Sequence, residues 1–152
     1  MSDPQMQPRP MPTATLDVVQ GGGSDPMCCP GDLATRRFGL HDGKLVESTP
    51  VVSGRLSAAS VGAAEWRLVA WDTAEPLTDD VEVSIGFADG RFAGRSRCNR
   101  YGAAVTDGDT AGEVRLGPTM GTRMACEGPA LAVEARYLKL LAGVNRVQFW
   151  NG

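Results

Sequence analysis

A strict alternation of apolar and polar residues between positions 81 and 87 is the feature that most constrains the fold. The apolar residues take every second position: Val81, Val83, Ile85 and Phe87. This period of two is that of a β-strand with one buried face. The Asp89-Gly90 pair that follows predicts a tight turn, so residues 91–96 should return antiparallel. Gly94 in the returning strand indicates a bulge or a close approach of another backbone.

Other segments extend this hairpin into a larger β structure. Trp66, Leu68 and Ala70 lie on one face of a strand, Val114 and Leu116 mark another strand, and the alternation within 144–150 predicts a last one. The 152 residues include nineteen glycines and ten prolines, which indicates many turns. This composition favours a mainly β fold over a helical bundle.

Residues 129–142 are the one segment with a clear helical period. Pro129 suits a first helical turn, where its missing N–H costs nothing, and Gly143 suits the end of the helix. The expected buried stripe consists of Leu131, Ala135, Leu138 and Ala142. The expected water-facing residues are Glu134, Arg136 and Lys139.

The first fifty residues have too little apolar mass to fold alone. Met1 to Ala14 is rich in proline and predicts a disordered leader, and residues 15–20 predict a short strand. Residues 34–48 predict a β-hairpin around Asp42-Gly43. We therefore interpret 1–50 as the tail of a preceding domain with a hairpin arm, 51–64 as a linker of small residues, and 65–152 as the main domain.

Two separated blocks rich in Arg, Cys and small residues carry a family resemblance. Their matching residues are Gly94, Cys98-Asn99-Arg100-Tyr101-Gly102 and Thr122-Arg123-Met124-Ala125-Cys126. In order, spacing and the helix-like segment that follows, residues 64–152 closely resemble the META domain family, also called HslJ-like. The resemblance implies a curved, antiparallel, lipocalin-like β-barrel or sheet covered by one helix. It also implies a role in stress response or envelope integrity, without established catalysis. We interpret the block from Cys98 to Tyr101 as a folding signature rather than an active site, since Asn99 can satisfy buried backbone groups and Tyr101 can pack inward.

A second, shorter string also has relatives. Asp25-Pro26-Met27-Cys28-Cys29-Pro30 is similar to a string in LppP/LprE-type lipoproteins, and its alternative interpretation is a rigid loop with an adjacent cysteine pair. In the META family one or two strands normally follow the position where this chain reaches Asn151-Gly152. We therefore expect a C-terminally truncated domain, or a partner strand supplied by the N-terminal arm or by another copy of the chain.

The four cysteines leave alternatives open. They are Cys28, Cys29, Cys98 and Cys126, and four cysteines allow three complete pairings. Since Cys98 and Cys126 belong to the two family blocks, they can form a disulfide if the blocks meet; otherwise they are two buried thiols. No Cys-x-x-Cys spacing occurs, and the single histidine, His41, is far from them, so we expect no metal site.

We find no catalytic set in the sequence, and we expect neither an enzyme nor a cofactor. A cysteine-based enzyme would need an exposed thiol of low pKa beside a base. Four arginines near the family blocks form a candidate anion patch: Arg95, Arg97, Arg100 and Arg123. Arginine binds carboxylates and phosphates well. We favour the alternative that these side chains pair with Glu82, Asp109, Glu113 or Glu127, or face solvent, because surface arginine is common and the net charge is negative.

Charge and hydropathy exclude two kinds of partner. The formal net charge is −3 with a pI near 5.1, so the chain lacks the net positive charge typical of nucleic-acid-binding domains. No apolar run reaches the roughly 20 residues of a membrane-spanning helix. The N-terminus does not read as a signal peptide, so a signal or lipid anchor would lie outside this chain. We expect a non-enzymatic module of a cell-envelope or extracellular protein, or alternatively a module that binds a small ligand or an acidic partner.

Overall fold

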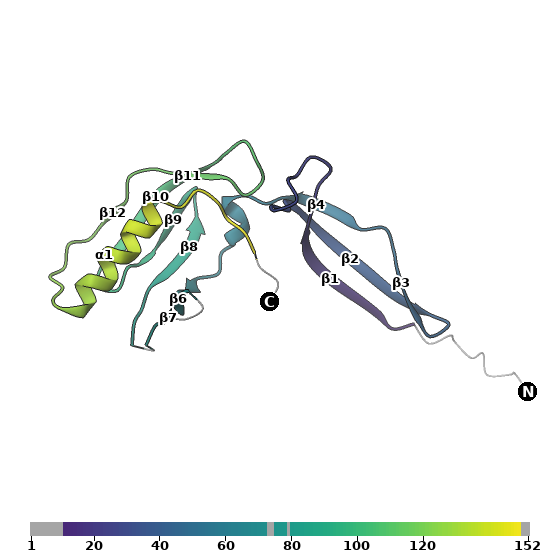
Figure 1. The fold of residues 1–152 in the computed structure, drawn as a ribbon, viewed down its shortest axis with the longest axis horizontal. Helices are drawn as coiled ribbons and strands as arrows, with labels where there is room; N and C mark the ends of the chain where they lie inside the picture. The colour runs from purple at the N-terminus through teal and green to yellow at the C-terminus, as the bar shows by residue number, and fades with distance from the viewer. Residues whose placement is uncertain (1–10, 73–74, 79, 150–152) are drawn as a thin grey trace, which may run out of the picture. The chain divides into compact units, whose positions relative to one another are not determined.

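The computed structural model describes residues 11–72, 75–78 and 80–149. The chain divides into two compact units, residues 1–55 and 56–152, and each is described by itself. Figure 1 shows the elements of both units.

The N-terminal unit is a four-stranded antiparallel sheet. Its strands are β1 (Thr13–Gln20), β2 (Asp32–His41), β3 (Lys44–Glu47) and β4 (Val51–Arg55). Strand β2 is central and pairs with β1, β3 and β4. The predicted hairpin is present: Asp42 and Gly43 both have positive φ, 49° and 74°, as a type I′ turn requires.

The segment 51–64, expected to be a linker, has structure of its own. Its first five residues form β4, and Arg55 at the end of this strand pairs with Asp25 and Asp32. Its middle forms a short 3₁₀ helix, η1 (Ala58–Val61), which packs in the C-terminal unit. Small polar residues adopt regular structure in this segment because they pair with residues distant in sequence. The composition of the segment alone does not reveal such partners.

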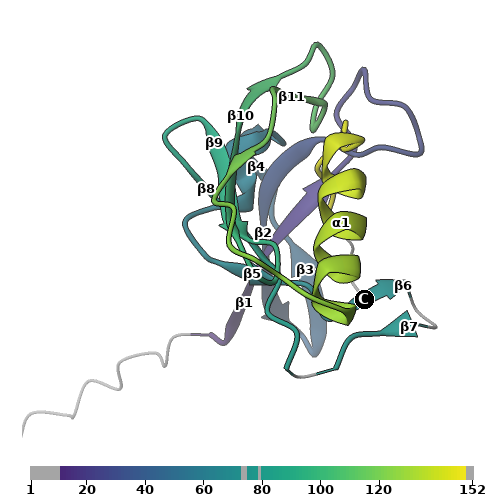
Figure 2. The same ribbon diagram turned by 90° about the vertical axis from the view of Figure 1, so that its left-hand side faces the viewer.

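The C-terminal unit is built around a second antiparallel sheet. Its elements after η1 are β5 (Trp66–Arg67), β6 (Ala70–Asp72), β7 (Glu75–Pro76), β8 (Ser84–Ala88), β9 (Arg91–Arg95), β10 (Arg100–Asp107), β11 (Val114–Leu116), β12 (Met120–Gly121) and α1 (Pro129–Ala142). The strand order is β11-β10-β9-β8-β5, β12 also pairs with β10, and β6 and β7 pair separately. The sheet is curved (Figures 1 and 2). Over the described residues it does not close into the barrel that the resemblance allowed, because β11 and β5 are not paired with each other.

The strongest sequence prediction, the hairpin after residue 81, is confirmed. Phe87 faces Phe92 across β8 and β9, and Asp89 and Gly90 form the turn with φ of 50° and 69°. The core on this side of the sheet contains Ala58, Phe92, Val105 and Val114, with Val61, Ile85, Phe87, Leu116 and Val147 packed against them. Burying one large apolar side chain in such a core contributes about 1.5–3 kcal/mol.

Helix α1 has the predicted bounds but a different buried face. Glu134 and Leu141 are buried, whereas Leu131, which was expected in the buried stripe, is 51% exposed. Ala135 and Ala142 are exposed too. The prediction that Glu134 faces water is therefore wrong, because this carboxylate meets hydrogen-bond donors in the turn between β9 and β10.

The segment after α1 lies beside β11 without forming the predicted strand. One β-bridge joins Glu113 to Arg146, and the N–H of Val147 donates to the carbonyl of Gly112 at 2.7 Å. The predicted turn at Asn151-Gly152 lies outside the described residues. Pairing of this end with the N-terminal arm or with another copy stays a prediction.

The predicted close approach at Gly94 is present and generates a test. A Cβ added to Gly94 would lie 2.1 Å from the carbonyl oxygen of Ser84. We expect Gly94→Ala to lower the free energy of unfolding by about 1–3 kcal/mol, because overpacked backbone must shift. Urea denaturation measures this. The matched control is Gly117→Ala, whose Cβ would meet Ala104 at an ordinary 3.7 Å; equal effects of the two substitutions would contradict the prediction.

Candidate functional site

The turn that joins β9 to β10 is the corner on which the two family blocks converge. Ser96 and Asn99 close this turn, since the N–H of Ser96 donates to the carbonyl of Asn99 at 2.9 Å. Between them Arg97 has a φ of 96°, in the region that favours glycine. Both Ser96 and Asn99 are buried, at 0% and 7% exposed.

The carboxylate of Glu134 reaches down from α1 into this corner. Its Oε2 accepts hydrogen bonds from the Ser96 hydroxyl at 2.8 Å and from the Asn99 N–H at 3.0 Å, and its Oε1 accepts one from Asn99 Nδ2 at 2.9 Å. The side chain of Glu134 thus fixes the helix on the turn through one carboxylate.

The other end of the Asn99 amide holds the second family block. Its Oδ1 accepts hydrogen bonds from the Met124 N–H at 2.6 Å and from the Thr122 hydroxyl at 2.9 Å. Thr122 also pairs with Arg100: its N–H donates to the Arg100 carbonyl at 3.0 Å, and its hydroxyl accepts from the Arg100 N–H at 3.1 Å. One asparagine therefore connects the turn, the helix and the loop at 122–126.

A disulfide joins the same two blocks. Cys98 and Cys126 are bonded, with their Cα atoms 6.2 Å apart at a sequence separation of 28. The alternative of two separate buried thiols is therefore wrong. Cys28 and Cys29 take no part in this bridge; they lie in the N-terminal unit.

The helix and the sheet also meet through two tyrosines. The hydroxyls of Tyr101 and Tyr137 are 2.6 Å apart, and the Tyr101 hydroxyl donates to the Ser84 carbonyl at 2.9 Å. Burial raises the pKa of Tyr101 far above its usual range, and the hydrogen bond with Tyr137 adds to that shift. Both rings pack edge to face with centroids 5.4 Å apart, so the pair is a neutral anchor.

Electrostatics at Glu134 is a balance of opposing effects. Burial, the largest effect, raises its pKa, because a charge is disfavoured away from water. The hydrogen bonds from Asn99 and Ser96 oppose this and together outweigh it, so the pKa lies below the ordinary 4.5. The carboxylate is therefore charged at neutral pH and fully engaged in holding the fold.

The four arginines of the predicted anion patch separate into different surroundings. Arg95 pairs with Glu82 at 3.2 Å and Arg97 with Asp80 at 3.3 Å. Within the described part of the chain no ion pair is found for Arg100 or Arg123. Among the residues that the structure describes, Glu82 is the one predicted carboxylate partner that pairs with this set, while Glu113 and Asp109 pair with Arg115.

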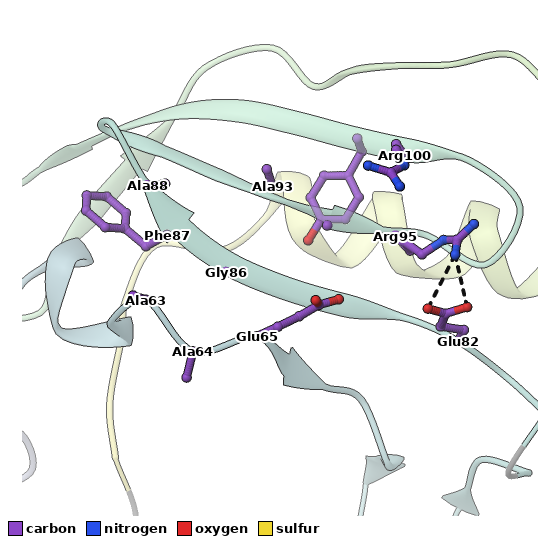
Figure 3. Close-up of a pocket in the computed structure, with 12 residues that line it drawn as sticks. Ala63, Ala64, Glu65, Glu82, Gly86, Phe87, Ala88, Ala93, Arg95 and Arg100 are labelled. Atoms are coloured by element: carbon purple, nitrogen blue, oxygen red, sulfur yellow. Dashed lines mark hydrogen bonds and ion pairs between the residues drawn. The ribbon is translucent and has the colours of Figure 1, made fainter.

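Two hollows flank the corner. One has a volume of about 510 Å³; Figure 3 shows it bordered by Arg95 and Arg100, with Gly86 and Ala93 on the sheet and Glu65 and Glu82 opposite. The other has about 590 Å³ and is lined by Asn99, Arg100, Glu134 and residues 119–124. Arg100 borders both hollows. On one side of β10 it is paired with Arg95 of β9, and on the other side its N–H donates to the Thr122 hydroxyl.

Sequence reasoning missed three members of the corner: Ser96, Glu134 and Tyr137. A signal for Glu134 was present, since it stands three and seven residues before Tyr137 and Leu141, on the face that the helix buries. A single acidic residue in an apolar arc indicates a buried, hydrogen-bonded group.

The comparison with known protein families confirms the resemblance that the two blocks carry. Residues 59–152 match the META domain, and the chain belongs to that family. No curated protein and no solved structure matches the chain significantly. Among the described residues no helix is long and apolar enough to cross a membrane.

The buried carboxylate predicts a specific pH dependence. Because the folded-state pKa of Glu134 is lowered, its contribution to stability is present above about pH 4.5 and is lost as pH falls through the folded value. At neutral pH we expect Glu134→Gln to cost about 1.5–3 kcal/mol per charged hydrogen bond lost, and this difference should shrink under acid. Urea denaturation from pH 7 to pH 3 measures it.

The control for this prediction removes a neighbouring exposed carboxylate. Glu127→Gln changes the same charge on the loop before α1, where the side chain is exposed, and should move stability by no more than about 0.5 kcal/mol. If the loss in free energy of unfolding caused by Glu134→Gln stays constant down to pH 3, the charge of Glu134 does not stabilise the fold.

Proposed function

We propose that the chain is a non-catalytic META module of an exported or envelope-attached protein, related to stress response or envelope integrity. The observation that carries the proposal is the Cys98–Cys126 disulfide, because such bonds persist in oxidising compartments outside the cytosol. The stress and envelope association comes from the resemblance to the family.

The state of the corner supports a structural rather than a chemical role for it. The polar atoms of Asn99 and Glu134 are engaged with one another and with the backbone. The two cysteines are oxidised to each other, so neither offers a thiolate as nucleophile. His41 is exposed in the N-terminal unit, outside both hollows. These groups hold the fold together, and the surfaces around them are left for binding.

Trapping the cysteines in living cells tests the compartment. Cells that make the protein are quenched with acid and treated with an alkylating agent, and its peptides are identified by mass spectrometry. We expect a peptide pair linked through Cys98 and Cys126, with no alkylation at either residue. Alkylation of both cysteines in protein from freshly quenched cells would refute an oxidising location.

A second candidate function is the binding of an acidic segment at the hollow of Figure 3. Its volume of about 510 Å³ falls within the usual range of ligand sites. Arg95 and Arg100 lie opposite each other across β9 and β10. The buried Nε of Arg95 has no hydrogen-bond partner in the described structure, while Nη1 of the same side chain contacts Glu82. An incoming carboxylate would bind the Arg100 fork, for which no ion pair is found among the described residues.

A charge reversal at Arg100 tests this binding. We expect a short peptide of alternating glutamate and glycine to bind at low salt and more weakly as salt screens the charges. Arg100→Glu should weaken binding about tenfold, equivalent to about 1.4 kcal/mol, as measured by calorimetry. Arg115→Glu makes the same change on β11, away from the hollow, and is the control. Equal losses in the two variants, or no binding by the unaltered chain, would reject the site.

A further inference from the structure

Three potential metal ligands converge at the corner. The sulfur atoms of Cys98 and Cys126 and a carboxylate oxygen of Glu134 all lie within 4.8 Å of one another. They come from three separate segments: the β9–β10 turn, the loop after β12, and α1. The fold thus assembles two soft donors and one hard donor that sequence spacing gave no reason to group.

We propose that the reduced form of this corner binds a zinc-like divalent cation, and that the disulfide is the metal-free state of the same site. A dithiol reductant supplies two electrons and two protons, becomes a disulfide itself, and leaves Cys98 and Cys126 as thiols. The cation then displaces both thiol protons into solvent. It forms two bonds to sulfur and one to the Glu134 carboxylate, and water takes the fourth position.

The spacing of the donors suits this ion. Zinc bonds to thiolate at about 2.3 Å and to carboxylate at about 2.0–2.2 Å, so tetrahedral ligands lie about 3.5–3.8 Å apart. The present limit of 4.8 Å is close enough for side-chain rotations to reach that spacing once the sulfur–sulfur bond is broken. The Glu134 carboxylate repels negative charge on the nearby Cys98 and Cys126 sulfurs and so disfavours free thiolates. A divalent cation bound between them removes this repulsion.

Glu134 is oriented for coordination and can release a lone pair. Metal-binding carboxylates are usually held by further hydrogen bonds, as this one is by Asn99. The Ser96 hydroxyl has a single proton and two acceptors within reach, Glu134 Oε2 at 2.8 Å and the Asn99 carbonyl at 3.1 Å. Turning that proton to Asn99 frees one lone pair of Oε2 for the cation, while the Asn99 N–H still donates to that oxygen.

The site also has a route to solvent and a scaffold that outlasts the disulfide. Cys98 and Cys126 are both half-buried, and the 590 Å³ hollow beside them is lined by Ser96, Asn99 and Glu134. The hydrogen bonds of Asn99 to Met124 and of Thr122 to Arg100 keep the two blocks together when the bridge opens. The two thiols therefore remain neighbours after reduction.

Metal titration of the full chain tests the proposal. The Cys28→Ser/Cys29→Ser variant leaves Cys98 and Cys126 as its only cysteines. It is reduced with a phosphine, desalted without oxygen, and titrated with Co²⁺ and with Zn²⁺ against a chromophoric chelator. We expect one cation per chain, a thiolate-to-cobalt charge-transfer band, and displacement of cobalt by zinc. The oxidised sample of the same variant should show neither.

Two variants and a folding measurement distinguish loss of metal binding from loss of the fold. Cys126→Ser in the same background should abolish the charge-transfer band of a two-thiolate site, and Glu134→Gln should weaken binding by about tenfold or more. Circular dichroism follows the fold: reduced protein that is folded, or that refolds on adding zinc, supports the site. The proposal is overturned if reduced protein takes up no more metal than oxidised protein, if Cys126→Ser binds equally well, or if zinc fails to restore an unfolded reduced chain.

Discussion

The buried charge of Glu134 is the constraint on which the C-terminal unit depends. Moving a carboxylate out of water costs several kcal/mol, and a hydrogen bond to a charged group returns about 1.5–3 kcal/mol. Three such bonds, from Ser96 and from two atoms of Asn99, can offset that cost, in agreement with the lowered pKa of Glu134. Because all three donors belong to the β9–β10 turn, the helix has one favourable position on the sheet.

The helix illustrates how far sequence reasoning reaches. Its bounds follow from Pro129, from the helical period and from Gly143, all of which act locally. Its buried face does not, because apolar residues occur around much of its circumference and a glutamate is ordinarily assigned to water. Leu131 is exposed and Glu134 is buried because of donors that lie 35 and 38 residues away in sequence. A local pattern can mark Glu134 as an acidic residue on an apolar face, but it does not identify these distant partners.

The same distinction separates the other predictions. The β8–β9 hairpin and the turn at Asp42-Gly43 were predictable because positive φ and strict alternation are local properties. Strand β4 was not, since its pairing with β2 and the contact of Arg55 with Asp25 are long-range. The convergence of Cys98 and Cys126 was predictable only through the family blocks. Three of the four arginines, Arg95, Arg97 and Arg100, are close in sequence; Arg95 and Arg100 border one hollow, whereas Arg97 pairs with Asp80.

Two separate interactions hold the corner together: the disulfide between Cys98 and Cys126, and the hydrogen bonds of Asn99. The disulfide and the Asn99 hydrogen bonds connect the same segments, the turn after β9 and the loop at 122–126. A disulfide that alone held two segments together would leave separated thiols on reduction, since chain entropy favours an open loop. Here the noncovalent network already closes that loop, so the bridge adds stability while the position of its sulfurs is set independently. The two interactions therefore allow the corner to change its chemistry without losing its geometry.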